Sequence, residues 1–438
     1  MAPRVMLVLP THTYRAAPFL EAAARLGLEV VVASNEASSL AAFMHGRQLT
    51  LDLGHPEQSA AAAAELARHH PLAAVVGVDE TSVLTAAHVA AGLGLRHNAV
   101  AAVEATRDKA RMRRLLAAAA VPQPAHVEIA GSHVAAAVAT VSGSAPAPVD
   151  AAASGDGRPA VAVGEVAMTV EQAGRDVGFP CVVKPVSLSG SRGVIRADDE
   201  PELLLAARRA RALCGDEAAP LLVEAFVGGP EVAVEGLLTA GRLDVIAVFD
   251  KPDPLEGPYF EETLYVRPSR LPPDGLQGIG AVTAEATRAL GLTEGPVHAE
   301  LRLGDRGPVV IEVAARSIGG LCSQILTFGS GITLEEVILR HAVGAPMPSL
   351  RPAGTATGVL MIPIPGRGTL RSVTGIDEVR SLPGLDSVSI TIPPGEEVVP
   401  LPEGDRYLGF LFASGPTPEA VERDLRAAHS RLTITIDP

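Results

Sequence analysis

The sequence predicts an α/β protein with more than one domain. Short apolar runs alternate with helical patterns over the first hundred residues, as they do in βαβ units. Hydrophobic residues make up 47% of the 438 positions and charged residues 20%, a composition that can bury sizeable cores. Because domains commonly contain roughly 150 residues, this length corresponds to about three of them.

The N-terminal elements follow one another at the spacing of a doubly wound domain over residues 1–104. They are expected at 4–9 (strand), 16–26 (helix, ended by Gly27), 29–34 (strand), 57–69 (helix), 73–78 (strand) and 82–91 (helix, ended by Gly92). In such a domain ligands lie beyond the carboxyl ends of the strands. Thr11, His12, Asp79 and Glu80 fall at such ends, but ordinary polar loop residues explain each of them at least as well.

Composition and missing motifs exclude several classes of protein. The first strand is followed by PTHTYR rather than by G-x-G-x-x-G, which disfavours a dinucleotide-binding oxidoreductase. The net charge of −14 argues against binding to a nucleic-acid backbone. Three cysteines without a C-x-x-C pair indicate neither a disulfide framework nor a zinc site. With no secretory leader and no apolar run of about 18 residues, we expect a cytoplasmic protein without a membrane partner.

The remaining chain divides at proline-rich stretches and at changes in composition. The expected units are 105–222, 223–345 and 346–438. The first of them contains an insertion at about 131–165, rich in Ala, Ser, Gly and Pro, in which we find no chemistry. The last alternates strands with a helix, which is typical of a compact α+β module. Its elements are expected at 356–362, 386–391 and 407–413 (strands) and 417–429 (helix).

A loop of small residues after a lysine, VVKPVSLSGSRGV at 182–194, is a candidate phosphate site. Lys184 ends an apolar strand, and the small residues after it would let backbone N–H groups approach an anion closely. Those residues are Ser187, Ser189, Gly190, Ser191 and Gly193. The lysine precedes the glycines, unlike in the Walker pattern. Taken alone, a hairpin turn beside a surface lysine is the simpler explanation.

Two further hairpins carry carboxylates. In LLVEAFVGGPEVAVEGLL (221–238), Glu224 ends one strand, and Glu231 and Glu235 share a face of the next. Taken alone, a hairpin with solvated glutamates is the simpler explanation. In VHAELRLGDRGPVVIEVAAR (297–316), a symmetric hairpin centred on Arg306 pairs Glu300 directly with Glu312.

The Glu300–Glu312 pair predicts a magnesium site. Opposed like charges are destabilising unless a cation lies between them, and Mg²⁺ accepts one or two protein carboxylates together with phosphate oxygens. Arg316 continues the alternation of Glu312 towards the same place. An exposed, solvated pair is the alternative, and a register slip of one residue would remove the pairing.

The order of the motifs resembles the ATP-grasp carboxylate–amine/thiol ligase superfamily over roughly residues 5–435. The segments that carry the resemblance are VDETSVLTAAHVAAGLGL, RDKARMRRLLAAAAVPQP, FPCVVKPVSLSGSRGV, LLVEAFVGGPEVAVEG, HAELRL and IEVAARSIGG. Within the superfamily the chain is most similar to the L-amino-acid ligases (dipeptide synthetases) and less similar to biotin carboxylases. The resemblance implies an ATP-grasp fold: an N-terminal doubly wound α/β domain, a two-lobed ATP-grasp core with a lid, and a C-terminal α+β module.

The resemblance also implies roles at matching positions. For ATP these are phosphate contacts from Lys109 and Lys184, a mobile lid formed by Ser187, Ser189, Gly190, Ser191 and Gly193, an adenine hinge at Glu224, Ala225 and Val227, and a ribose carboxylate at Glu231. Glu300 and Glu312 would hold Mg²⁺, with Mn²⁺ as a substitute. Arg316, helped by the backbone of Gly319, would stabilise the tetrahedral intermediate. Many relatives have asparagine at the position of Ala314, so either Glu312 bridges two ions or one ion binds less tightly here.

The substrate site is expected around FDKPDPLEGPYFEETLYVRPSRLP (249–272), which is similar to the acceptor-pocket segment of peptide-forming relatives. Glu261 or Glu262 could bind an α-ammonium group. His298 could orient a substrate or deprotonate the amine, and a satisfied structural histidine is equally compatible with the sequence.

The expected reaction is the ATP-dependent joining of a carboxylate, in the first place an amino acid, to an amine through an acylphosphate, with release of ADP and phosphate. The nearest alternative is a biotin-carboxylase-like enzyme that activates bicarbonate. A non-catalytic nucleotide sensor is disfavoured, because both lysines, both carboxylates and Arg316 are present. Small-molecule substrates are the expected partners, and a homodimer is expected because relatives often form one.

Overall fold

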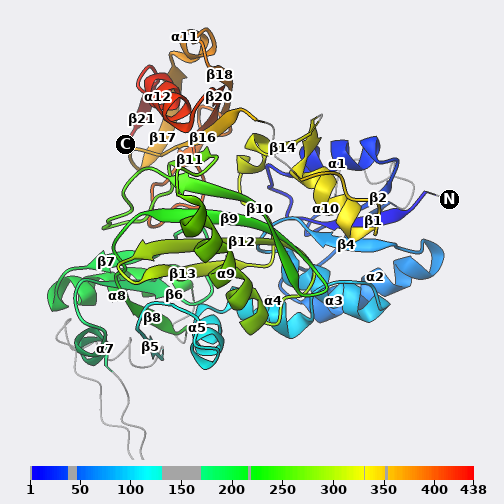
Figure 1. Ribbon diagram of the computed structural model, residues 1–438, viewed down its shortest axis with the longest axis horizontal. Coiled ribbons are helices and arrows are strands. Elements are labelled where there is room, and N and C mark those ends of the chain that lie inside the picture. The colour runs from blue at the N-terminus through cyan, green and yellow to red at the C-terminus, as the bar shows by residue number, and fades with distance from the viewer. Residues whose placement is uncertain (1, 38–46, 131–168, 216–218, 330, 351–353) are drawn as a thin grey trace, which may run out of the picture.

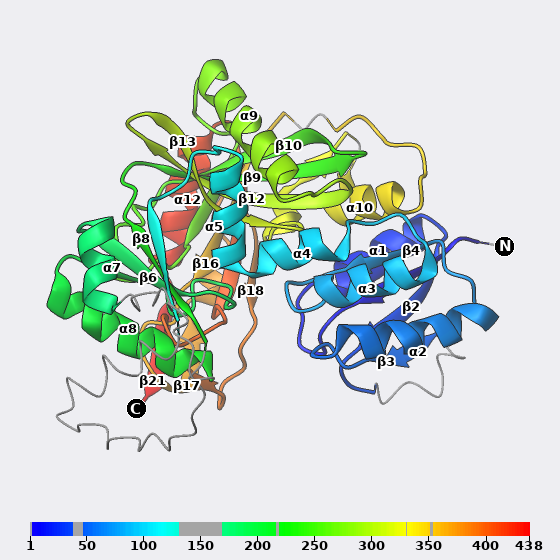
Figure 2. The same ribbon diagram turned by 90° about the horizontal axis from the view of Figure 1, so that it is seen from below.

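The computed structural model describes residues 2–37, 47–130, 169–215, 219–329, 331–350 and 354–438. Helices combine with parallel and antiparallel sheets (Figures 1 and 2), which confirms the predicted α/β fold class. The predicted insertion at about 131–165 lies outside the described residues. No helix in the described ranges combines the length and apolar character needed to cross a bilayer.

The N-terminal domain contains a parallel sheet in the order β3-β2-β1-β4. Its elements are β1 (Arg4–Val8), α1 (Ala16–Arg25), β2 (Glu29–Ser34), β3 (Gln48–Thr50), α2 (Pro56–His69), β4 (Ala74–Gly77) and α3 (Val83–Leu93). The strand order reverses at β1, so the carboxyl ends of β1 and β4 form the switch point at which such domains bind ligands. The expected stop at Gly92 is wrong: α3 continues through Leu93 and ends at Gly94, which adopts the left-handed conformation.

Further helices and a four-stranded antiparallel sheet, ordered β5-β8-β6-β7, form the first lobe of the core. The elements are α4 (Val100–Arg107), α5 (Lys109–Ala118), β5 (His126–Ile129), α7 (Val170–Val177), β6 (Cys181–Pro185), β7 (Ile195–Ala197), α8 (Glu200–Cys214) and β8 (Leu221–Ala225). Side chains of α7 and α8 pack with those of this sheet in one buried cluster. The Asp108 carboxylate accepts a hydrogen bond from Arg111 N (2.8 Å), so α5 begins at Lys109.

An eight-stranded sheet, ordered β13-β12-β9-β10-β11-β16-β20-β18, runs from the second lobe into the C-terminal module. Second-lobe elements are β9 (Glu231–Thr239), β10 (Arg242–Lys251), β11 (Leu264–Arg267), α9 (Pro273–Ala289), β12 (Gly295–Gly304), β13 (Gly307–Ala314), the 3₁₀-helix η2 (Cys322–Ile325), β14 (Thr327–Phe328), β15 (Ile332–Thr333) and α10 (Leu334–Ala342). The module adds β16 (Ala356–Ile362), β17 (Gly368–Thr374), α11 (Ile376–Arg380), β18 (Leu385–Ile390), β19 (Glu397–Val398), β20 (Gly409–Gly415), α12 (Pro418–His429) and β21 (Thr433–Asp437). The two parts of the sheet meet where β11 pairs with β16.

The β12–β13 hairpin differs from the predicted one in a way that matters for the site. Its turn is two residues long, with Gly304 opposite Gly307, so it is not centred on Arg306. The predicted Glu300–Glu312 pair is nevertheless present, because a β-bulge at Ile311 shifts the register by one residue. The position of the turn and the extra residue of the bulge shift the register by one residue in opposite directions, so Glu300 still pairs with Glu312.

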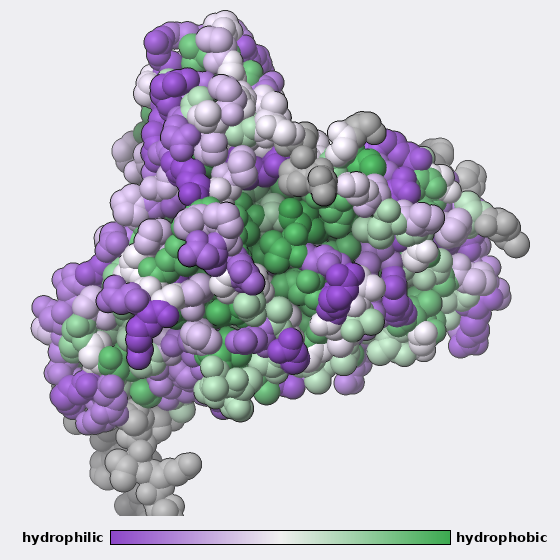
Figure 3. All heavy atoms as spheres, viewed as in Figure 1, coloured by the Kyte–Doolittle hydropathy of each residue, from purple (hydrophilic) through white to green (hydrophobic). Residues whose placement is uncertain are grey.

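Hydrophilic residues cover much of the face drawn in Figure 3, with one apolar area in the hollow between the C-terminal module and the N-terminal domain. Beneath the surface, α1 and α10 pack against one face of the parallel sheet in a shared core. The second lobe thus contributes a helix to the N-terminal domain's core, and this contact holds the two parts side by side.

Candidate active site

A pocket with about 700 Å³ of empty space, part of it open solvent, lies between the sheet of the first lobe and strands β9, β12 and β13 of the second. It brings together most of the residues predicted from the sequence: Lys109, Lys184, Ser189, Ser191, Glu224, Ala225, Val227, Glu231, Glu262, Glu300 and Glu312. The other predicted residues, Ser187, Gly190, Gly193, Glu261, His298, Arg316 and Gly319, do not line it. Apolar side chains of Val182, Phe226, Leu255, Phe260 and Ile311 form part of its wall, which suits a flat aromatic base.

Both predicted lysines point into this pocket and are almost fully buried. Lys184 Nζ lies 2.6 Å from Glu224 Oε2, and Lys109 Nζ donates to the Leu188 carbonyl (2.7 Å) and lies 3.3 Å from Glu312 Oε1. Glu224 also receives two hydrogen bonds from Arg113. Burial alone would raise the pKa of Glu224, but the charges of Arg113 and Lys184 lower it to about 2. Its carboxylate therefore faces cations, and the contact of the hinge backbone with adenine stays a prediction.

The small-residue loop splits into a part that faces the pocket and a part that does not. Ser189 and Ser191 line the pocket. Gly190, Ser191 and Gly193 all have positive φ, between 56° and 68°, which the glycines adopt without strain. The expected phosphate contact from Gly193 is wrong for its N–H, which donates to the Pro402 carbonyl (2.9 Å). A Cβ at Gly193 would lie 2.8 Å from the Pro185 ring, so the glycine serves close packing.

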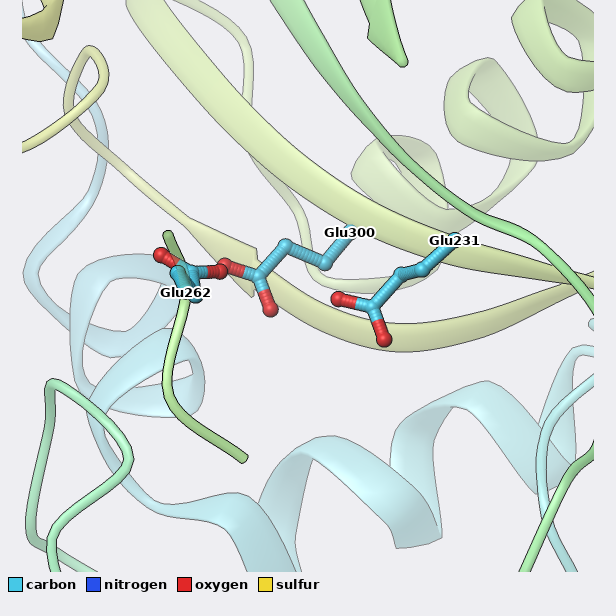
Figure 4. Close-up of side chains that lie close together, drawn as sticks. All are labelled: Glu231, Glu262 and Glu300. Carbon is cyan, nitrogen blue, oxygen red and sulfur yellow. The ribbon is translucent and has the colours of Figure 1, made fainter. Parts of the chain in front are cut away.

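Three carboxylates converge at the floor of the pocket, Glu231, Glu262 and Glu300 (Figure 4), with ligand atoms within 4.8 Å of one another. They surround the ammonium group of Lys251, which the sequence analysis missed. Lys251 Nζ donates to Glu231 (2.7 Å) and to Glu262 and lies 3.7 Å from Glu300 Oε1. Against the effect of burial, the three carboxylates raise the pKa of Lys251. Because this cation already compensates the cluster, we do not assign a metal ion to these three residues.

The strand register explains why these groups meet. On the same face of the sheet, Lys251 of β10 lies beside Glu231 of β9, and Glu231 lies beside Arg302 of β12. Arg302 Nε donates to Glu231 Oε2 (2.8 Å). The next row places Glu300 between Ala233 and Glu312. Counting the pairing across β9, β10 and β12, and not only within the β12–β13 hairpin, would have identified Lys251 and Arg302 as neighbours of Glu231.

Glu300 and Glu312 fit a magnesium ion better than the Lys251 cluster does. They offer hard oxygen donors from adjacent strands, each is about a quarter exposed (21% and 27% of the side chain), and both line the pocket that holds the lysines. Burial acts to raise the pKa of Glu300, and the charges of Lys251 and His298 outweigh it and lower that pKa. An ionised carboxylate is what metal binding requires.

His298 is held from both sides by carboxylates. Its Nδ1 lies 2.6 Å from Glu235 Oε1 and its Nε2 lies 3.5 Å from Glu300 Oε1. Burial would lower the pKa of His298, but hydrogen bonds to Glu235 and Glu300 raise it to about 9. A raised pKa favours the protonated imidazole, which suits the predicted role of orienting a substrate better than the predicted role of deprotonating the amine. Both roles stay predictions. Glu235 Oε1 also accepts a hydrogen bond from Ile318 N (2.8 Å). This bond connects the Glu235–His298 pair with the loop that follows Arg316.

Arg316 lies at the junction of the second lobe with the N-terminal domain. Its Nε donates to Glu80 Oε2 (2.7 Å), just beyond the carboxyl end of β4. Next to it, Arg15 donates to Ser317 Oγ (2.6 Å) and to the Val78 carbonyl (2.8 Å). Burial would lower the pKa of Arg316, and the charges of Glu80 and Glu312 raise it. Glu80 thus has a partner at the switch point. The Gly319 carbonyl accepts a hydrogen bond from Cys322 N (3.3 Å).

The segment expected to bind the amine, 249–272, contributes Leu255, Phe260 and Glu262 to the pocket. Glu262 lines it and is held by Lys251, while Glu261 lies outside. Burial and the charge of Glu300 raise the pKa of Glu262, and Lys251 and Tyr265 oppose them. Burial alone raises the pKa of Glu261.

Three family descriptions match separate parts of the chain. Residues 20–97 match the ATP-grasp N-terminal domain, residues 177–325 the ATP-grasp domain, and residues 360–437 the L-amino acid ligase C-terminal domain 2. These matches agree with the resemblance drawn from the motifs.

The chain is also similar to individual known proteins, two of which are ligases. The chain is 26% identical over 379 residues to an uncharacterized protein, y4rH, of Sinorhizobium fredii, a match that covers 85% of this chain and 70% of that one. It is 27% identical over 187 residues to the alanine–anticapsin ligase of Bacillus subtilis (strain 168), covering 37% of this chain but only 39% of that enzyme. The crystal structure of an L-amino acid ligase from Bacillus licheniformis superposes with a TM-score of 0.76 at 24% identity, over 100% of this chain and 99% of the other. That likeness establishes the fold.

Proposed function

We propose that this chain, which belongs to the ATP-grasp carboxylate–amine ligases and is most similar among them to the L-amino acid ligases, joins the carboxyl group of an amino acid to an amine. The reaction would consume ATP and release ADP and phosphate through an acylphosphate. One observation supports the proposal most strongly. A single pocket is lined by Lys109, Lys184, Glu300 and Glu312, with Lys109 Nζ 3.3 Å from Glu312 Oε1.

The first step would be attack of the substrate carboxylate on the γ-phosphorus of ATP. Lys109 and Lys184 would neutralise the phosphate oxygens, and this charge neutralisation with correct positioning is most of what phosphoryl transfer needs from a protein. Bound between Glu300 and Glu312, Mg²⁺ would supply further positive charge to the phosphates. The apolar wall at Phe226 and the hinge backbone at Ala225 and Val227 would hold the base, with Glu231 at the ribose.

The second step would be attack of the amine on the acylphosphate. Arg316, fixed by Glu80, would stabilise the developing oxyanion before phosphate leaves. Glu262, the carboxylate that the acceptor segment contributes to the pocket, would bind the ammonium group of a substrate. Ala314 offers no ligand atom, so we assign one tightly held ion to the Glu300–Glu312 pair. The loop at 187–193 would exclude water, which would otherwise hydrolyse the acylphosphate.

The decisive test is mass spectrometry of reactions that contain the full-length protein, ATP, Mg²⁺ and a matrix of amino-acid pairs. A new amide with equimolar ADP and phosphate is expected. AMP with pyrophosphate would refute the acylphosphate route. A carboxylated product formed only with bicarbonate and biotin would establish the carboxylase alternative, which the C-terminal match disfavours.

Substitution Arg316→Ala tests the assignment of the oxyanion group. We expect at least a tenfold loss of amide formation, because a positioned charge at the oxyanion contributes roughly 2.7–4 kcal/mol in comparable sites. Binding of ADP, measured by calorimetry, should change less than threefold, because Arg316 does not line the nucleotide pocket. Unchanged turnover would remove Arg316 from the mechanism.

A further inference from the structure

Arg113, in the middle of α5, is 1% exposed and joins the two lobes. On one side it holds Glu224 of the first lobe, with Nε 2.5 Å from Oε1 and Nη2 3.3 Å from Oε2. On the other it donates to two carbonyls of β13 in the second lobe, Val310 O (3.0 Å, from Nη1) and Ile311 O (2.7 Å, from Nη2). None of the assignments above uses this side chain.

The Ile311 carbonyl belongs to the bulged residue of β13, and the Val310 carbonyl to the regularly paired residue before it. Between the turn and the bulge, the ladder pairs Leu301 with Val310, so an unbroken ladder would place Ile311 opposite Glu300. Because residue 311 is the extra one, Glu312 takes that place instead. A bulged residue loses regular ladder partners, and a buried carbonyl without a partner costs roughly 1–3 kcal/mol. Arg113 supplies a donor to the Ile311 carbonyl, and a second donor to the Val310 carbonyl beside it on the edge strand β13.

We propose that Arg113 is a positioning residue for the metal site, and that by holding the bulge at Ile311 it keeps Glu312 opposite Glu300. This inference rests on the proposed function, since it gives the paired carboxylates their role. The same guanidinium also pairs with Glu224, whose Oε2 lies 2.6 Å from Lys184 Nζ, and a positive charge of any shape beside Glu224 preserves that pairing. A planar guanidinium with five donors can serve a carboxylate and two carbonyls at once, whereas an ammonium group cannot.

The test is Arg113→Lys, which keeps the positive charge beside Glu224 but removes the planar guanidinium and its several donors. Manganese binding to the full-length protein saturated with ADP is followed by electron paramagnetic resonance, so no turnover is needed. We expect the Mn²⁺ dissociation constant to rise at least tenfold, while ADP affinity without metal changes less than threefold. The control is Arg114→Lys on the same helix, an exposed residue paired with Glu128, which should leave Mn²⁺ binding unchanged.

Deletion of Ile311 separates positioning from general stabilisation. The deletion removes the bulge, and in the resulting regular ladder Glu312 follows Val310 and again faces Glu300. If Arg113 acts through the bulge, Arg113→Lys should change Mn²⁺ affinity less than threefold in the deletion background. A tenfold loss in both backgrounds would overturn the proposal.

The remaining outcomes are equally decisive. If Arg113→Lys lowers the melting temperature but leaves Mn²⁺ affinity unchanged, Arg113 is a structural residue only, and the proposal fails while the proposed function stands. If the unaltered protein with ADP binds no Mn²⁺, the Glu300–Glu312 metal site itself fails, and this inference fails with it.

Discussion

Lys251 shows what a single residue contributes and what sequence reasoning overlooks. Its ammonium group lies among three carboxylates that are close enough to suggest a metal site by themselves. Removing one partner of such a buried group leaves an uncompensated charge, which is far more costly than the loss of a surface ion pair. The sequence FDKPDP carried no signal for this role, because the role depends on the pairing of β10 with β9.

The cysteines give a residue-scale prediction. Burial, with a smaller effect of Asp198, raises the pKa of Cys181 to about 11, and burial raises the pKa of Cys322 further above its ordinary value. At pH 8 only about one Cys181 side chain in a thousand would be a thiolate, the reactive form. Cys214, at the end of α8, is half-buried. We therefore expect one rapid equivalent of thiol labelling per folded chain, measured with a chromogenic disulfide reagent.

Replacement of the half-buried cysteine completes that experiment. In Cys214→Ser the rapid phase should vanish, and denaturant should then reveal two further thiols. Rapid labelling of more than one thiol in the folded protein would contradict the burial of Cys181 and Cys322.

At the scale of elements, the Glu300–Glu312 hairpin was predicted from residue spacing, but for an incomplete reason. The side-chain alternation of two strands can be counted in the sequence, whereas a bulge depends on donors from elsewhere in the fold, here Arg113. The N-terminal strands and helices were predictable because their apolar periodicity is strong. The three-residue strand β3 was missed, since so short a run has no period.

The turn between β8 and β9 gives an element-scale prediction. Gly229 has φ +98°, and a Cβ there would lie 2.2 Å from the Leu303 carbonyl oxygen of β12. Gly229→Ala should therefore cost at least about 2 kcal/mol of unfolding free energy, from backbone strain and the clash together. The loss of unfolding free energy is measured by denaturant unfolding of the variant and the unaltered protein.

The neighbouring glycine is a matched control. A Cβ at Gly228 would meet nothing within 4 Å, so Gly228→Ala should cost less than about 1 kcal/mol. Equal losses in the two variants would show that the turn is not anchored on β12.

At the scale of the whole molecule, the site depends on parts that are far apart in the sequence. Glu80 of the N-terminal domain fixes Arg316, and the C-terminal module reaches the lid through the Pro402 carbonyl, which accepts from Gly193 N. Such contacts cannot be read from motifs, because neither partner has a local pattern that marks it. The order of motifs did indicate the family, since it reflects the whole fold. The four-part division, the homodimer and the cytoplasmic location remain predictions.

A contact between the C-terminal module and the first lobe gives the prediction at this scale. Arg209 of α8 donates to both carboxylate oxygens of Glu403, one at 2.8 Å, close to the Gly193–Pro402 contact. An exposed pair of this kind contributes at most about 1 kcal/mol. Glu403→Gln should therefore speed the release of a fluorescent ADP analogue about two- to fivefold, measured by stopped flow. Glu396→Gln, which breaks the exposed pair with Arg406 inside the module, should leave the rate unchanged; equal acceleration by both variants would argue against a role in closure.

The pairing of β11 with β16 also limits how this protein can exchange parts during evolution. Leu264 and Val266 of the second lobe share a core with Ile362, Leu411 and Val421 of the module, and the ladder runs on without a gap. A recombination event that replaced only the module would leave β11 without its partner strand β16. It would also remove the module's side chains from the shared core. An incoming module would succeed only if it brought a strand in the register of β16, so second lobe and module are expected to have been inherited together.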